Sequence, residues 1–102
     1  MKTRLLKRLR RRAKRNVRLD SDGHHFYIIL QEIDDDGSKR KLYYEPNTGE
    51  FCFSRWTYSK HTKMIELEEK LNQARRDAVL EFVNRMRLRE EREQVCKIIN
   101  NL

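Results

Sequence analysis

Proline and glycine are scarce in this chain of 102 residues, which contains one proline and three glycines. Together with a hydrophobic content of 37% and a charged content of 39%, this scarcity indicates a folded domain with a very polar surface and not a disordered segment. No run approaches the roughly 18 consecutive apolar residues of a membrane-spanning helix, and the first residues lack the apolar core of a secretory signal. We therefore expect a cytoplasmic protein of one domain that has no membrane partner.

Recognisable catalytic and metal-binding motifs are also lacking. The chain has no glycine-rich phosphate loop and no serine in a nucleophile elbow. Cys52 and Cys96 lie in different predicted elements, so they form no metal-binding or redox motif. His24 and His25 are adjacent on a predicted strand and therefore point to opposite faces, which prevents them from sharing one metal ion. We predict a protein that is not an enzyme and uses neither a metal nor a cofactor.

Acidic residues are missing from the beginning of the chain. Residues 1–18 contain seven arginines and three lysines but no Asp or Glu, which gives this segment a net charge of +10. The remaining residues contain fourteen basic and sixteen acidic side chains, so their net charge is −2. An asymmetry of this size predicts binding to a polyanion or to an acidic protein surface.

Residues 1–18 are predicted to form a basic, amphipathic helical arm, and residues 19–102 a single small domain. A narrow apolar stripe follows one side of the arm, and Arg and Lys cover its other sides. The residues of the stripe are Leu5, Leu6, Leu9 and Ala13. Like charges four residues apart repel each other by a few tenths of a kcal/mol per pair, which docking of the arm or binding of an anion would relieve.

The pattern changes to that of strands between about residues 16 and 55. The segment HHFYIILQEI alternates between two faces that are both apolar in its middle, which predicts a central strand. Turn sequences bracket this segment, and Pro46 to Gly49 predict a further hairpin. We expect an antiparallel meander of three to four strands, at residues 16–20, 24–33, 39–45 and 50–55.

A long helix is predicted from about residue 60 to about residue 100, with Ser59 as its N-cap. Its apolar residues recur at spacings of three and four, so they would lie across the sheet and close the core. This stripe consists of Met64, Leu67, Leu71, Ala74, Ala78, Phe82 and Met86. The predicted fold class is α+β, with a basic N-terminal helix, an antiparallel meander and a long C-terminal helix packed on the sheet.

A second apolar set near the C-terminus does not continue that stripe. At about 100° per residue, it lies on roughly the opposite side of the helix from Met86. Either the helix breaks within residues 89–94 and folds back, or one long helix carries a second apolar face for a partner or for homo-oligomerisation. The residues of this predicted contact are Leu88, Val95, Ile99 and Leu102.

The arm predicts binding to RNA or DNA through the phosphate backbone, largely without sequence specificity. Guanidinium groups match pairs of phosphate oxygens better than ammonium groups do, and backbone contacts do not read bases. Docking to an acidic protein is the alternative role of the arm, whereas membrane binding is disfavoured because the stripe has no Trp or Phe anchor. The predicted phosphate contacts are Arg4, Lys7, Arg8, Arg10, Arg11, Arg12, Lys14, Arg15 and Arg18.

Aromatic side chains on or beside the sheet would add base stacking to these contacts if they were exposed. Most of the aromatic residues are expected to fill the core under the long helix. The predicted candidates for exposure and stacking are Tyr44, Trp56 and Tyr58.

The first dozen residues, MKTRLLKRLRRR, resemble the starts of small uncharacterised proteins encoded by tailed phages of gut bacteria. The resemblance implies a second class of function, that of a phage virion accessory or adaptor protein acting through protein contacts of its C-terminal helix. The arm would then face packaged DNA or an acidic subunit, and the protein would be found in the virion or in the host cytoplasm.

Overall fold

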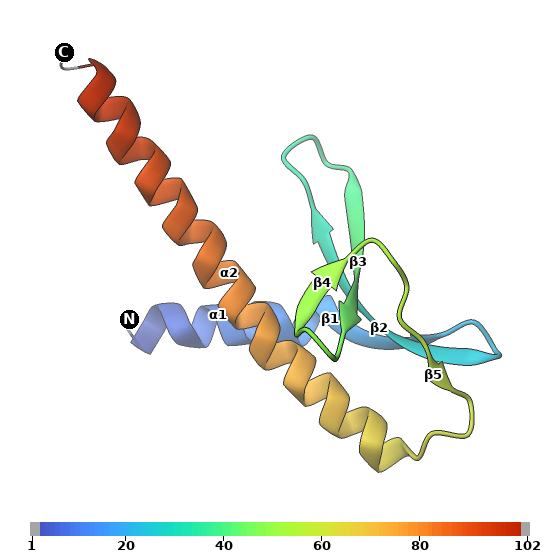
Figure 1. The fold of residues 1–102 in the computed structure, drawn as a ribbon. Coiled ribbons are helices and arrows are strands. Elements are labelled where there is room, and N and C mark those ends of the chain that lie inside the picture. Colours follow the sequence, from blue (N-terminus) through green and yellow to red (C-terminus); the bar gives the residue numbers. More distant parts are fainter. Residues whose placement is uncertain (1–2, 101–102) are drawn as a thin grey trace.

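The computed structural model describes the backbone of residues 3–100 and the side chains of residues 3–86. It contains a helix, a five-stranded sheet and a second, much longer helix (Figure 1). The elements are α1 (Thr3–Asn16), β1 (Val17–Ser21), β2 (His25–Ile33), β3 (Lys39–Glu45), β4 (Glu50–Cys52), β5 (Tyr58–Ser59) and α2 (Met64–Asn100). The predicted α+β class and its order of elements are confirmed.

β2 is the central strand of the antiparallel sheet. β1 pairs along one of its edges, with Val17 opposite Leu30, and β3 pairs along the other, with Ile29 opposite Tyr43. β4 continues the meander beside β3, and the short β5 pairs with the start of β2. Residues 27–30 of β2 are buried on both faces of the sheet, as their apolar pattern predicts.

One apolar core joins α1, the sheet and α2. The buried members of this core are Leu9, Ala13, Val17, Ile28, Leu30, Leu42, Tyr44, Ala74, Ala78 and Phe82. The helices cross on the same side of the sheet (Figure 1), and both contribute alanines, whose small side chains let helix backbones approach closely. The apolar side of the basic arm is therefore built into the fold.

α2 is continuous to Asn100, so the alternative in which its end folds back is wrong. Its stripe is buried at Leu67 and Phe82, but Met64 and Met86 at the ends of the stripe are 57% and 38% exposed. Beyond residue 86 the helix backbone extends away from the sheet (Figure 1). The predicted partner contact lies outside the described side chains: Leu88, Val95, Ile99 and Leu102.

The start of α2 differs from the prediction, because Ser59 belongs to β5 and is not the N-cap of the helix. Ser59 pairs with His25, and its hydroxyl accepts a hydrogen bond from the His61 amide at 3.2 Å in the following turn. The neighbouring Tyr58 pairs with Phe26 and packs against the core. Cross-strand pairing and the burial of Tyr58 thus outweigh the capping preference of the serine.

The turn between β3 and β4 is fastened to α2 through a buried tyrosine. Tyr44 is fully buried, and its hydroxyl donates a hydrogen bond of 2.5 Å to Asp77 Oδ2. Burial, together with this hydrogen bond, raises the pKa of the Tyr44 hydroxyl. Gly49 in the turn has a φ of +74°, and a Cβ at that position would lie 3.2 Å from the same Asp77 oxygen.

Gly49→Ala should therefore destabilise the protein more than Gly37→Ala does. Both glycines have a positive φ, which costs an alanine about 1 kcal/mol or more, but a Cβ at Gly37 would meet nothing within 4 Å. We expect urea denaturation to show a loss of unfolding free energy that is about 1 kcal/mol larger for Gly49→Ala. Equal losses in the two variants would contradict the close approach of Asp77 to the turn.

Candidate nucleic-acid interface

Six cationic side chains form one exposed face of α1, which we call the basic face. They are Arg4, Lys7, Arg8, Arg11, Lys14 and Arg15, and together they line a shallow surface groove. Their spacings place them on the side of the helix opposite the buried Leu9 and Ala13. The face is about 16 Å long at ~1.5 Å per residue. Among the side chains that the structure describes, no carboxylate forms an ion pair with any of the six.

Arg12 is a cation of α1 that contacts the body of the fold. Its guanidinium lies 3.4 Å from Glu32 Oε1 and 4.0 Å from the centre of the Phe82 ring. An ion pair and a cation–π contact of this kind hold the side chain against β2 and α2. Arg12 is one of the predicted phosphate contacts, but its guanidinium is engaged in contacts within the protein and does not belong to the basic face.

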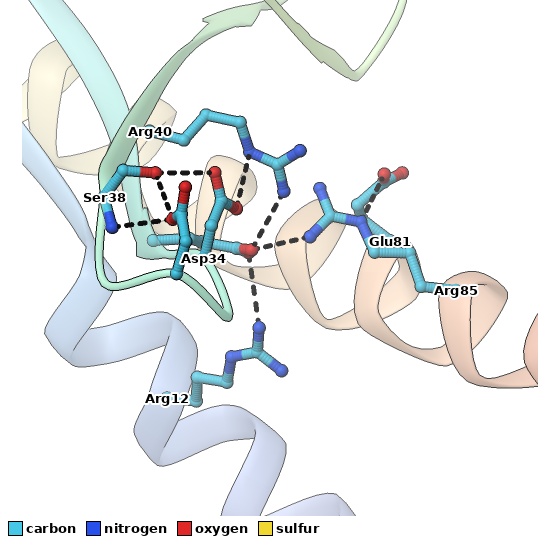
Figure 2. A network of polar contacts seen from close by, with 8 residues as sticks. Arg12, Asp34, Ser38, Arg40, Glu81 and Arg85 are labelled. Atoms are coloured by element: carbon cyan, nitrogen blue, oxygen red, sulfur yellow. Dashed lines mark hydrogen bonds and ion pairs between the residues drawn. The ribbon is translucent and has the colours of Figure 1, made fainter.

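Three guanidinium groups from three elements meet at the buried carboxylate of Glu32, as Figure 2 shows. One comes from α1, Arg40 approaches from β3 at 3.4 Å, and Arg85 of α2 donates a hydrogen bond of 2.7 Å. Arg40 also pairs with Asp34, and Arg85 with Glu81, so three carboxylates balance three arginines. This Glu32 network joins α1, the β2–β3 hairpin and α2.

Two further predicted phosphate contacts lie on other surfaces. Arg10 borders a groove between α1 and α2. Arg18 lies on the sheet face that points away from the helices, because the alternation of β1 buries Val17 on the helix side. Its guanidinium donates a hydrogen bond of 2.9 Å to Gln31 Oε1. Of the nine predicted contacts, the structure therefore brings six together and separates three.

Sequence reasoning missed two arginines of α2 that extend the positive surface. Arg75 and Arg76 line the groove between the helices together with Arg10 and Lys14. Arg75 donates hydrogen bonds of 3.3 and 3.2 Å to the carbonyl of Val17, which fastens α2 to β1, whereas Arg76 is exposed. The only sequence feature that could have indicated them is that two arginines are adjacent in the predicted helix. That feature does not show which side of α2 packs against α1.

The three stacking candidates differ in their environments. Tyr44 is wrong as a candidate, because it is fully buried and its ring packs against Phe51 with centroids 5.2 Å apart. Tyr58 is half-buried against the core, and burial raises the pKa of its hydroxyl. Trp56 is 38% exposed and is the most accessible of the three.

A cation–aromatic cluster occupies the sheet face that points away from the helices. The Arg55 guanidinium lies 4.3 Å from the centre of the Tyr27 ring and 5.3 Å from that of Tyr43. The two rings meet edge to face at 5.8 Å, and a hydrogen bond to Tyr43 raises the pKa of Arg55. Because α1 packs on the other side of the sheet, this cluster is not part of the basic face.

The described residues contain neither a metal-binding cluster nor a membrane-spanning helix. None of their His, Cys, Asp and Glu side chains come together in threes or more in a way that could hold a metal ion. Neither described helix combines the length and the apolar content that crossing a membrane requires. No protein-family model, curated protein or solved structure matches the chain.

Arg12→Ala should destabilise the protein more than Arg11→Ala, although the two changes remove the same charge from neighbouring positions. Loss of Arg12 uncovers Phe82 and leaves the buried Glu32 with two of its three cations. We expect a difference of about 1 to 2 kcal/mol in unfolding free energy, seen as a lower Tm by several degrees for Arg12→Ala. Equal Tm values would contradict the structural role of Arg12.

Proposed function

We propose that the protein binds the phosphate backbone of RNA or DNA through the basic face of α1, largely without sequence specificity. The observation that carries this proposal is that six exposed cations share one helical face without a described carboxylate partner. Their mutual repulsion is an energetic cost in the free protein. Phosphates placed along this face would relieve it and would release the counterions that surround the nucleic acid.

The size of the basic face is compatible with several simultaneous phosphate contacts. A DNA duplex carries one charge per ~1.7 Å of axis, so a face about 16 Å long spans roughly nine phosphate charges. This count covers both strands of the duplex and is sufficient for six contacts, made with the phosphates that face the helix. The rest of the surface of α1 packs on the fold or borders the groove between α1 and α2. The helix can therefore approach a duplex or a single strand only with its basic face.

The composition of the face suits contacts with the phosphate backbone. It consists entirely of Arg and Lys, without the Asn or Gln side chains that read adenine in the major groove. Contacts of this type fix the position of a protein on nucleic acid but carry no sequence information directly. The second proposed role, that of a phage accessory or adaptor protein, depends on side chains of the C-terminal helix beyond residue 86.

The proposal predicts a steep dependence of affinity on salt. Fluorescence anisotropy with labelled duplex DNA should give a slope of log K against log salt of about −5, as expected for six phosphate contacts, after co-purifying nucleic acid is removed at high salt. At about 0.1 M salt, the variant with Arg8, Arg11 and Arg15 changed to Glu should bind at least 100-fold more weakly than the wild-type chain. Labelled RNA, titrated in parallel, shows which polymer is preferred.

The matched control carries the same change in net charge on a different surface. Changing Arg18, Lys39 and Lys41 to Glu reverses three exposed cations of the sheet. Binding by this control should weaken much less, because screening confines surface electrostatics to about 10 Å at 0.1 M salt. Equal losses in both triple variants would contradict a localised interface. Absence of binding by the wild-type chain, together with retention on polyglutamate, would instead assign the basic face to an acidic protein.

A further inference from the structure

A groove between α1 and α2 presents apolar side chains that the fold itself does not cover. Leu6 of α1 and Val79 and Leu80 of α2 form its floor, together with the buried Ala13. Leu80 is 61% exposed, and Leu6 and Val79 are only half-buried. The groove has a volume of about 560 Å³ and lies beside the basic face on the circumference of α1. A contiguous apolar surface that is partly open to solvent marks an interaction site more often than isolated exposed side chains do.

The rim of this groove is positively charged. Arg10 and Lys14 border it from α1, and Arg76 borders it from α2. All three are exposed, and within the described part of the chain none of them has an ion-pair partner. No Asp or Glu is among the residues that line the groove. An occupant must therefore combine an apolar surface with negative charge.

We propose that the groove binds an acidic amphipathic helix of a partner protein. Two packed helices leave a furrow that accepts the apolar ridge of a third helix, and helix-in-groove recognition uses anchors at spacings of three and four. Leucine-like anchors of the partner would cover Leu6 and Leu80, and flanking Asp or Glu side chains would pair with Arg10, Lys14 and Arg76. This inference does not depend on nucleic-acid binding by the basic face.

The rim charges disfavour a second copy of the chain, and the side chains of the floor disfavour a membrane and nucleic acid. In a two-fold dimer through this groove, the rim cations of one copy would face those of the other, and like charges at an interface oppose association. A membrane surface is disfavoured because the groove offers leucine and valine but no Trp or Phe anchor. Nucleic acid is disfavoured at the floor, because single strands stack their bases on aromatic side chains, which this groove lacks.

The experiment selects ligands from a yeast-displayed library of random peptides of about 16 residues, roughly four helical turns. The full-length chain is the target, and Leu80→Ser is the counter-selection. We expect enrichment of peptides with Asp or Glu around apolar residues at helical spacing. The best peptide, labelled with fluorescein, should bind Leu80→Ser at least tenfold more weakly than the wild-type chain. Arg76→Glu should weaken binding by a similar factor at low salt.

Ile65→Ser is the matched control, because Ile65 is 65% exposed on the same helix but does not line the groove. Its affinity for the peptide should equal that of the wild-type chain.

The proposal is overturned if no enriched peptide depends on Leu80, or if the Leu80-dependent peptides are not acidic. A wild-type dimer in sedimentation that Leu80→Ser dissociates would overturn it in favour of a second copy. Leu80-dependent binding to phosphatidylserine vesicles would overturn it in favour of a membrane. Leu80→Ser should keep its affinity for duplex DNA, so failure of this proposal is distinguishable from failure of the proposed function.

Discussion

Leu9 and Ala13, the two α1 residues that are almost completely buried, fix the rotation of this helix about its axis. Because the apolar stripe of α1 is narrow, only one orientation buries it, and the side chains of the opposite arc must face solvent. Full burial of one leucine stabilises a fold by about 1.5 to 3 kcal/mol, whereas each like-charge pair on an exposed helix costs only a few tenths. The shared core can therefore hold a face of six cations in place without neutralising them.

The two edges of the buried side of α1 differ, because one is packed against the fold and the other is open to solvent. On one edge, Arg12 meets the buried Glu32 and covers Phe82, so that side of the helix is closed against β2 and α2. On the other edge, Arg10 pairs with no carboxylate among the side chains that the structure describes, and the surface beside it ends in the exposed Leu80. A buried carboxylate is tolerated only where cations surround it, so the position of Glu32 decides which edge is closed. The open edge is the groove between the helices.

Apolar periodicity together with the turn sequences accounts for both helices, for four of the five strands and for the central position of β2, although β4 ends at Cys52 and not at the predicted residue 55. The sequence pattern does not predict features of the structure that depend on contacts between residues far apart in the chain. β5 has only two residues and therefore shows no period. Tyr43 and Tyr44 are adjacent and point to opposite faces, but the sequence does not say which face α2 covers. Arg12 stands in a run of three arginines, and its contact with Glu32 is fixed by how α1 packs across the sheet. Most of the basic face could be predicted, because all of its charges lie on one short helix. The groove and the role of Arg76 could not, because they depend on how α1 and α2 cross.

The basic face and the groove share a boundary on α1, so their two proposed ligands would be coupled. Lys14 lines both surfaces, and Arg10 and Arg76 stand beside it. An acidic helix in the groove would place carboxylates within a Debye length of the basic face, about 8 Å at physiological salt, and would lower the positive potential that attracts phosphates. By linkage, bound nucleic acid would weaken the acidic partner by the same factor. Rising salt would weaken the ion pairs of the groove ligand as well as the phosphate contacts, but it would leave apolar burial in the groove largely unchanged. It would therefore favour the groove ligand over the nucleic acid.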